Sequence, residues 1–281
     1  MAPVSRGDWA PTPEPLPVPV VDNHCHLDFP LAQTPERSIE DLLDEAASVG
    51  VDRVVQIGCD PESVQWTADA VTRYPRMLGG LAVHPNDAAR LAARGEYEAA
   101  FAEVARLARG ERIRVVGETG LDYFRTGPEG RDHQITAFRD HVALAKELGL
   151  TLQIHDRDAH QDVLDVLARD GAPERTVFHC FSGDTAMADV CVERGYYVSF
   201  AGTVTFSNAH ELRAAAAVVP LGQILVETDA PFLTPHPHRG GANSPAQVAR
   251  TARVVADCVG VDLETFCAAV SATSEDLYGP W

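Results

Sequence analysis

The sequence predicts a single (β/α)8 TIM barrel, an α/β fold, and three observations support this class. Short β-branched runs alternate with longer amphipathic segments along most of the chain. The length of 281 residues suits one such barrel, although two smaller domains would also fit. A doubly wound open sheet would carry a glycine-rich phosphate loop after an early strand, and the segment GETG at 117–120 does not match that fingerprint.

The first half of the chain predicts four strands and the helices between them. The first strand begins near Val20 and ends in the histidines of VVDNHCHLDF. Later β-branched runs predict strands over 52–58, 77–85 and 113–123. Apolar residues at helical spacing predict helices over 38–50, 61–74 and 96–110. Gly50 suits a helix end and Pro61 suits a first helical turn.

The second half of the chain continues the same alternation. Strands are expected over 151–155, 175–181, 196–202 and 223–229. Helices are expected over 131–149, 159–171, 184–195 and 208–220. Two additional C-terminal helices are expected over about 245–259 and about 262–278.

The domain organisation follows from the absence of a composition break. Residues 19–281 are predicted to form one barrel domain, because no linker-like stretch interrupts them. Residues 1–18 are rich in proline and predict an extended N-terminal arm, anchored by Trp9.

Composition limits the classes of function. Asp and Glu number 41 against 23 Lys and Arg, and the resulting net charge of -18 disfavours a broad basic surface that grips nucleic acid. The net charge does not exclude a local metal-containing site that cleaves phosphate esters.

The six scattered cysteines form no CxxC pair, and the N-terminus lacks the features of a secretory signal. We therefore predict a cytoplasmic protein with no membrane segment, and the sequence leaves the oligomeric state open.

Metal-competent side chains gather at the predicted carboxyl ends of strands. Successive side chains of a strand alternate between its two faces, so His24 and His26 share a face and Cys25 points the other way. In a barrel the carboxyl ends meet at one mouth, so residues far apart in sequence share one site. The residues at these ends are His24, His26, His84, Glu118, His155, His179 and Asp229.

This donor set is larger than one tetrahedral ion requires. It suits two adjacent divalent ions, Mg, Mn or Zn, with Glu118 as the bridging ligand. The only lysine, Lys146, lies in the middle of a predicted helix, so it cannot supply a carbamylated bridge. Two such ions would lower the pKa of a shared water and steady negative charge on a phosphate or carbonyl oxygen.

Six motifs stand in order within residues 19 to 278: NHCHLD, GLAVHP, VGETGLDY, IHDRDA, FHCFSG and VETDAPFLTP. Together they resemble the motifs of the TatD family of metal-dependent hydrolases and deoxyribonucleases. The resemblance implies metal ligation by His24, His26, Glu118, His155, His179 and Asp229. It also implies that Asp229 accepts the proton of the attacking water, so Asp229 and Glu118 are the expected catalytic residues.

Five further residues are candidate substrate contacts, and each has a structural alternative. The resemblance implies that His84 contacts a substrate phosphate, whereas the Pro85 turn could also account for it. Arg157 suits a bidentate phosphate contact, whereas a salt bridge within its own loop is the alternative. Asp122 can line the pocket or cap its loop. Ser182 and Arg239 can contact substrate, or form a turn and solvate a loop, respectively.

The preferred prediction is a divalent-metal-dependent deoxyribonuclease that resembles a 3′–5′ exonuclease. It would hydrolyse DNA phosphodiester bonds with a metal-activated water and act on DNA ends or single-stranded DNA. One alternative is a hydrolase of a small-molecule or aminoacyl ester or amide, and another is an inactive metal-binding interaction module.

Ser244 and Ser274 depart from the family pattern, which usually shows Glu and Asn there, so loop anchoring or substrate contacts at these positions need explanation.

Overall fold

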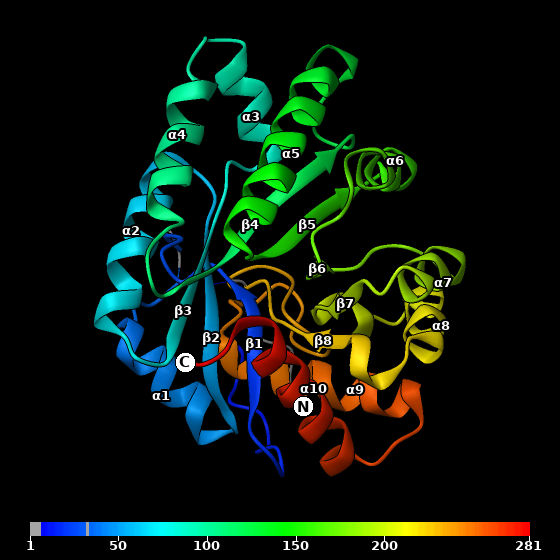
Figure 1. Ribbon diagram of the computed structural model, residues 1–281. Coiled ribbons are helices and arrows are strands. Elements are labelled where there is room, and N and C mark those ends of the chain that lie inside the picture. Colours follow the sequence, from blue (N-terminus) through cyan, green and yellow to red (C-terminus); the bar gives the residue numbers. More distant parts are fainter. Residues whose placement is uncertain (1–6, 32–33) are drawn as a thin grey trace. The chain divides into compact units, whose positions relative to one another are not determined.

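The strands form one parallel sheet in the order β1 to β8 (Figure 1). The computed structural model describes residues 7–31 and 34–281, so the first six residues of the predicted arm lie outside the described residues. Parallel strands in sequence order, separated by helices, confirm the predicted (β/α)8 class.

The chain divides into two compact units. Among the described residues, the first unit comprises 7–31, 34–56 and Gly183–Pro280, and the second comprises Ile57–Ser182 together with Trp281. The first unit contains β1 (Val20–Cys25), most of β2 (Val51–Gly58), β7 (Tyr197–Phe200) and β8 (Ile224–Val226). The second contains β3 (Met77–Leu81), β4 (Ile113–Asp122), β5 (Thr151–Arg157) and β6 (Thr176–Phe178).

Within the first unit, the chain after β8 returns to β1. The Asp229 N–H donates to the His24 carbonyl at 2.9 Å, and the His26 N–H donates to the Ala230 carbonyl at 2.7 Å. These bonds join the carboxyl end of β1 to the loop that follows β8. They fix the residues of both segments against one another, because backbone pairing sets the register.

The helices of the first unit match the predicted segments within a few residues. They are α1 (Ile39–Ser48), α7 (Thr185–Glu193), α8 (His210–Val218), α9 (Val248–Val259) and α10 (Leu263–Tyr278). Short 3-10 turns occupy Gly202–Thr205, Leu221–Gln223 and Pro245–Gln247. Helix α1 begins at a capping box in which the Ser38 hydroxyl accepts from the Asp41 N–H at 3.0 Å. Helix α10, red in Figure 1, packs against β1 and β8.

The segment before β1 is attached to the first unit by side chains and backbone. The Trp9 indole N–H donates to the Pro35 carbonyl at 2.8 Å, and its ring lies 5.3 Å from the guanidinium carbon of Arg37. Ala10 and Leu16 are buried. Trp9 therefore fixes this segment, as the sequence predicts.

The helices of the second unit include one that the sequence patterns did not predict. They are α2 (Pro61–Arg73), α3 (Pro85–Ala92), α4 (Tyr97–Leu107), α5 (Pro128–Leu148) and α6 (His160–Asp170). Helix α3 was missed because β3 ends at Leu81, not at the predicted residue 85. In the described chain, 7–31 and 34–281, no helix combines the length and apolarity needed to cross a membrane.

Candidate metal centre

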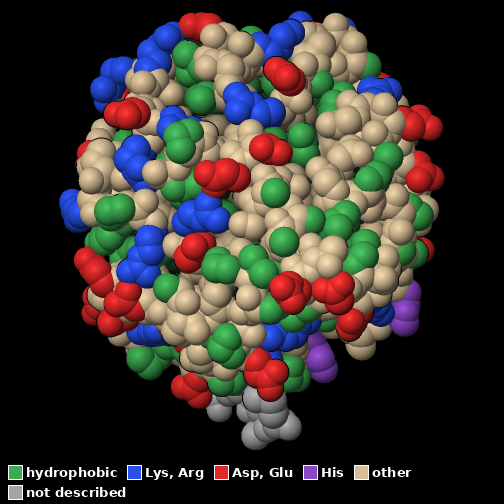
Figure 2. Space-filling view, turned by 60° about the horizontal axis from the view of Figure 1, so that its bottom comes forward, with side chains coloured by type: hydrophobic (Ala, Val, Ile, Leu, Met, Phe, Trp, Pro, Cys, Tyr) green, Lys and Arg blue, Asp and Glu red, His purple; other side chains and the backbone are tan. Residues whose placement is uncertain are grey.

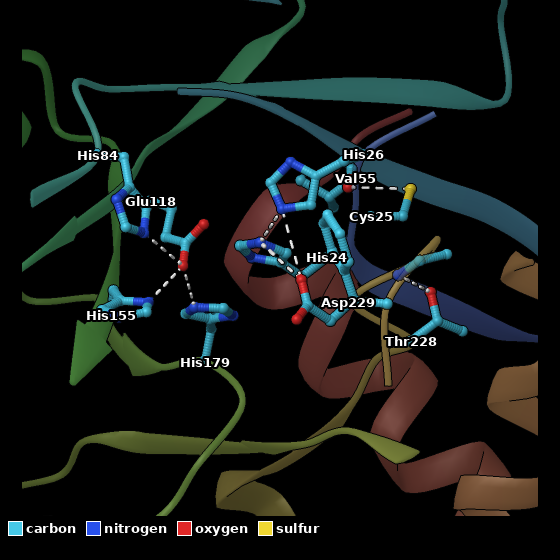
Figure 3. A network of polar contacts seen from close by, with 12 residues as sticks. His24, Cys25, His26, Val55, His84, Glu118, His155, His179, Thr228 and Asp229 are labelled. Atoms are coloured by element: carbon cyan, nitrogen blue, oxygen red, sulfur yellow. Dashed lines mark hydrogen bonds and ion pairs between the residues drawn. The ribbon is translucent and has the colours of Figure 1, made fainter. Parts of the chain in front are cut away.

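Three of the predicted ligands form a cluster within the first unit. The Nε2 atoms of His24 and His26 lie 3.1 Å apart, and Asp229 Oδ1 lies 3.4 Å from His26 Nε2 and 3.9 Å from His24 Nε2 (Figure 3). His24 is fully buried, whereas the Asp229 side chain is 16% exposed. Of the three groups, Asp229 is therefore the one most open to a water molecule.

The alternation of β1 accounts for the placement of the two histidines. Their rings approach each other edge to face, with centres 5.0 Å apart, and Cys25 between them is buried and donates to the Val55 carbonyl at 3.5 Å (Figure 3). This is the arrangement that the sequence predicts. Asp28, beyond the histidines, accepts from Gln56 Nε2 at 2.7 Å and so helps to hold this loop.

A buried carboxyl group that sequence reasoning missed anchors the same cluster. Asp22 accepts hydrogen bonds from the Thr228 N–H at 2.8 Å and from its hydroxyl at 2.5 Å. Burial raises the pKa of Asp22 well above its usual range, although the bonds from Thr228 act in the opposite direction. The sequence contained an indication of this contact, because Asp22 precedes His24 by two residues and so is expected on the same face of β1.

The other predicted ligands form a second cluster within the second unit. Glu118 Oε1 lies 2.5 Å from His155 Nδ1, 2.9 Å from His179 Nε2 and 3.6 Å from His84 Nε2 (Figure 3). Glu118 lies inside β4, and His155 lies in β5. His179 follows the short strand β6 directly, because that strand ends at Phe178 and not at the predicted residue 181.

In this second cluster, the carboxylate and the imidazoles shift the pKa values of one another. Burial acts to raise the pKa of Glu118, but the imidazoles of His179, His84 and His155 together lower it well below its usual range. Burial acts to lower the pKa of His155, but Glu118 and Asp122 raise it to about 9. A negative carboxylate thus faces the protonated imidazole of His155, and a divalent cation can replace that proton.

Asp122 supports His155 and does not stand open to solvent. It is buried, and its carboxylate lies 3.2 Å from His155 Nε2 while accepting from Asn86 Nδ2 at 2.9 Å and from the Arg125 N–H at 2.8 Å. Burial acts to raise the pKa of Asp122, but the hydrogen bonds from His155, Asn86 and Arg125 lower it overall. The predicted capping contact is therefore present, together with a contact to His155, a predicted ligand, that the sequence did not indicate.

His84 combines the two roles that the sequence left open. Its Nδ1 accepts from the Asn86 N–H at 3.2 Å and caps α3, while its Nε2 lies 3.6 Å from Glu118 Oε1. His84 is partly exposed, with 18% of its side chain accessible.

The other three candidate substrate contacts have protein partners. The guanidinium carbon of Arg157 lies 4.0 Å from the centre of the Phe124 ring, and that of Arg239 lies 4.5 Å from the Phe206 ring. The Ser182 hydroxyl donates to the Asp156 carbonyl at 3.0 Å, as expected of a turn residue. The cation–π contact of Arg157 was not predicted, because Phe124 lies 33 positions away in the sequence.

The two departures from the family pattern are buried anchoring residues. The Ser274 hydroxyl donates to Asn23 Oδ1 at 3.0 Å, next to the predicted ligand His24, and Ser244 Oγ lies 3.4 Å from Glu45 Oε2. Both serines are buried. Both contacts lie within the first unit: Ser274 joins α10 to β1, and Ser244 joins the segment before the turn Pro245–Gln247 to α1.

The donor sets fit divalent metal ions. Ligand nitrogens about 2.0–2.1 Å from a tetrahedral ion stand about 3.3 Å apart, and the His24, His26 and Asp229 atoms have separations of 3.1 to 3.9 Å. In the second unit, ligand atoms of His84, Glu118 and His155 lie within 4.8 Å of one another. A carboxylate behind a ligand histidine, as Asp122 stands behind His155, is a frequent feature of metal sites. A (β/α)8 fold with such clusters at its strand ends defines the class of metal-dependent barrel hydrolases.

Comparisons with known proteins agree with this class. The family described as "TatD related DNase" matches residues 21–279. A Mycobacterium tuberculosis protein named as an uncharacterized metal-dependent hydrolase, TatD, is 42% identical, covering 92% of this chain and 98% of its own. YabD of Bacillus subtilis, named in the same way as a metal-dependent hydrolase, is 32% identical with the same coverage of 92% and 98%. The chain therefore belongs to the TatD family of metal-dependent hydrolases.

Solved structures show the same fold. YjjV of Escherichia coli, described as a TatD homolog, superposes with a TM-score of 0.84 at 27% identity and covers 93% of this chain and 98% of its own. A TatD family hydrolase of Entamoeba histolytica superposes with a TM-score of 0.82 at 17% identity, covering 95% of this chain and 100% of its own. At that identity, the second structure supports the fold alone.

Proposed function

We propose that the protein is a deoxyribonuclease that hydrolyses phosphodiester bonds at DNA ends with two divalent metal ions. The observation that carries this proposal is the contact of one buried oxygen, Glu118 Oε1, with both His155 at 2.5 Å and His179 at 2.9 Å. A carboxylate that faces two imidazoles suits a metal ligand better than a structural ion pair. The family described as "TatD related DNase" supports the choice of substrate.

We infer that both clusters bind metal ions that serve the hydrolytic reaction. Carboxyl ends of parallel strands meet at one face of a (β/α)8 barrel, and active sites of this fold lie there. The proposed ligands are His24, His26, Glu118, His155, His179 and Asp229, with Glu118 as the bridge. Histidine-rich ligation suits Zn and Mn, whereas phosphodiester hydrolysis often uses Mg or Mn.

Asp229 is the proposed proton acceptor. Bound divalent ions would acidify the attacking water and stabilise the charge that develops on a phosphate oxygen. The Asp229 carboxylate takes the proton of that water, since it is the more exposed carboxylate of the proposed ligand set, at 16% against 8% for Glu118. The bond from its N–H to the His24 carbonyl holds it beside the two histidines.

The charge balance favours a local site over a broad binding surface. The net charge is -18, and acidic and basic side chains are interspersed on the face that Figure 2 shows. A single-stranded DNA end suits such a protein better than a long duplex, because it needs fewer phosphate contacts. His84, Arg157 and Arg239 are the proposed phosphate contacts, with Ser182 as a further hydrogen-bond donor. Asp122 becomes a positioning residue for His155.

The cellular location stays a proposal. We propose that the protein is cytoplasmic, since the cysteines in the described part of the chain form no disulfide.

Nucleotide release from single-stranded DNA tests the proposed activity. Purified protein with Mg²⁺ or Mn²⁺ is expected to release nucleotides, and Asp229→Asn is expected to lower the rate at least a hundredfold, as loss of a general base does. Asp257→Asn, an exposed change on α9, is the matched control and leaves the rate unchanged.

Other substrates separate the alternatives. Metal-dependent turnover of an ester or aminoacyl panel without nucleotide release would favour the small-molecule hydrolase. Any metal-dependent turnover that Glu118→Gln abolishes would exclude an inactive binding module.

A further inference from the structure

Large exposed hydrophobic side chains gather on the loops after the strands. Among residues 7–31 and 34–281, those that stay exposed are Phe29, Phe124, Phe232 and Val218. Phe29 follows β1, Phe124 follows β4 and Phe232 follows β8, whereas Val218 ends α8. In (β/α)8 enzymes the loops after the strands form the substrate site. Three of the four exposed side chains are therefore aromatic rings at the functional ends of strands.

Two of these rings touch each other beside a proposed metal ligand. The centres of the Phe29 and Phe232 rings lie 4.9 Å apart with an interplanar angle of 67°, and the side chains are 49% and 42% exposed. The Phe232 ring lies 6.2 Å from the His26 ring. An exposed aromatic surface therefore begins next to the first cluster and lies wholly within the first unit.

The backbone beneath this pair is fixed by buried partners. The amide of Asn243, which is buried, donates to the Phe232 carbonyl at 2.5 Å and to the Thr228 carbonyl at 3.0 Å. The Phe232 N–H donates to the Asp229 carbonyl at 2.8 Å, and the Phe29 N–H donates to the His26 carbonyl at 3.3 Å. Both exposed rings are thus bonded through their backbones to residues of the first cluster.

Folding alone does not account for this exposure. A half-exposed phenylalanine forgoes much of the stabilisation that burial gives an aromatic side chain. Single exposed apolar residues are scattered over most protein surfaces and need no explanation. Two exposed phenylalanine rings in contact beside a candidate active site form a patch, and such a patch indicates a binding site.

We propose that Phe29 and Phe232 form a stacking platform for the nucleobase of a DNA end whose phosphate is bound at His24, His26 and Asp229. This proposal rests on the proposed nuclease function. Aromatic rings bind bases of any sequence, because every base has a π-face. Base and phosphate of one nucleotide are joined by a single sugar, so a platform next to His26 suits the base adjacent to the bound phosphate.

The charge of the protein adds a reason for such a platform. At a net charge of -18 the long-range field opposes the approach of a polyanion. Stacking is an attraction between uncharged rings, so this field does not weaken it. A nuclease with a negative net charge can therefore bind the nucleobase of its substrate by stacking while the metal ions bind the phosphate.

Two matched substrates test the platform in the full-length, Mn²⁺-loaded enzyme. One is a short single-stranded oligonucleotide, and the other is the same strand with an abasic sugar at the end that is cleaved. Phe232→Ala is expected to raise KM for the normal strand about tenfold, the usual effect of losing one base–aromatic stack. KM for the abasic strand and kcat for both strands are expected to stay the same.

Further variants distinguish stacking from simple apolar contact. Phe232→Trp is expected to keep the low KM, whereas Phe232→Leu is expected to behave like Phe232→Ala because leucine has no π-face. Val218→Ala, an exposed hydrophobic side chain on α8, is the control and should leave KM unchanged. Equal effects on the normal and abasic strands, or a wild-type KM in Phe232→Leu, would overturn the proposal.

A binding measurement separates this proposal from the proposed function. A 2-aminopurine deoxynucleotide loses fluorescence when it stacks, and we expect quenching with the metal-loaded wild-type protein and none with Phe232→Ala. Quenching without cleavage of any DNA would support the platform and contradict the nuclease. Cleavage without quenching, together with an unchanged KM in Phe232→Ala, would support the nuclease and contradict the platform.

Discussion

Asp122 holds His155 from the nitrogen opposite to Glu118. His155 Nδ1 lies 2.5 Å from Glu118, and His155 Nε2 lies 3.2 Å from Asp122. With both ring nitrogens engaged, the orientation of this imidazole is fixed, and Asp122 increases its basicity. At the scale of the residue, the second cluster thus depends on a carboxylate that is not itself a proposed ligand.

We expect Asp122→Asn to lower metal affinity by about 10- to 100-fold, the range observed when the partner of a ligand histidine is lost. The amide has nearly the same shape, so the bonds to the Asn86 side chain and the Arg125 backbone change less than the contact with His155. Titration of the metal-free protein with Mn²⁺ or Zn²⁺, followed by calorimetry, measures the affinity.

Asp162→Asn serves as the control for that titration. Its carboxylate accepts from the Tyr123 hydroxyl at 2.6 Å and contacts no proposed ligand. Equal affinities of Asp122→Asn and the wild type would show that His155 does not depend on Asp122.

Strand alternation and motif order predict much of the site residue by residue. The face shared by His24 and His26, and the opposite face taken by Cys25, follow from the period of a strand. The partner of Asp122 could not be predicted, because His155 lies 33 residues later and only the pairing of β4 with β5 brings the two together. The stacking of Arg157 on Phe124 depends on the same pairing.

At the scale of elements, α5 is connected to the end of β3 by a buried histidine. His141 Nε2 accepts from the Val83 N–H at 3.0 Å, and its Nδ1 lies 2.7 Å from the Ala137 carbonyl. Burial lowers the pKa of His141 from its ordinary 6.5 to about 4. This neutral imidazole therefore supports the loop that leads to His84.

The low pKa of His141 predicts a loss of stability in mild acid. Between about pH 6.5 and about pH 4 the unfolded chain binds a proton that the folded protein does not, so the free energy of unfolding falls as the pH falls. This effect amounts to about 2 kcal/mol between pH 7 and pH 5. Urea unfolding of metal-free wild type and His141→Gln at both values measures it.

The difference between the two proteins isolates the contribution of His141. His141→Gln cannot take up the proton, so its stability should fall less than that of the wild type over this range. Parallel losses in both proteins would show that other groups cause the acid sensitivity.

Element types were more predictable than element ends. The strands and most helices follow from hydrophobic period, but β3 and β8 end earlier than the patterns indicate, at Leu81 and Val226. Tertiary contacts account for the early end of β8: beyond Val226, the chain forms hydrogen bonds with β1 through Thr228 and Asp229. Helix α3 begins where His84 caps it, and that cap was not recognised in the sequence.

At the scale of the whole molecule, the acidic charge predicts a weak dependence of DNA binding on salt. If Arg157 and Arg239 are the charged phosphate contacts, the slope of log affinity against log salt is about -1.4 for single-stranded DNA. Fluorescence anisotropy of a labelled strand with Mn²⁺-loaded Asp229→Asn, which binds without rapid cleavage, measures this slope.

A slope steeper than about -3 would indicate a broad basic contact surface, which the proposed function excludes. Arg106→Gln is a suitable control, because Arg106 lies on α4 in an exposed pair with Glu103 and has no proposed contact with DNA.

The fold class was the most predictable property of the whole chain. Repetition of a strand and a helix along 281 residues leaves few architectures, and the sequence order of β1 to β8 agrees with the (β/α)8 class. The substrate was not predictable in the same way, because one fold and one set of ligands can perform hydrolysis on different esters.

We propose that six residues hold the two divalent ions that serve hydrolysis. Anomalous diffraction from crystals of the Mn²⁺-loaded protein tests it most directly. We expect two strong peaks, one beside His24, His26 and Asp229 and one beside His155 and His179, with Glu118 as a ligand to both. An ion bound elsewhere, or no ion at either cluster in an enzyme that hydrolyses DNA, would contradict it.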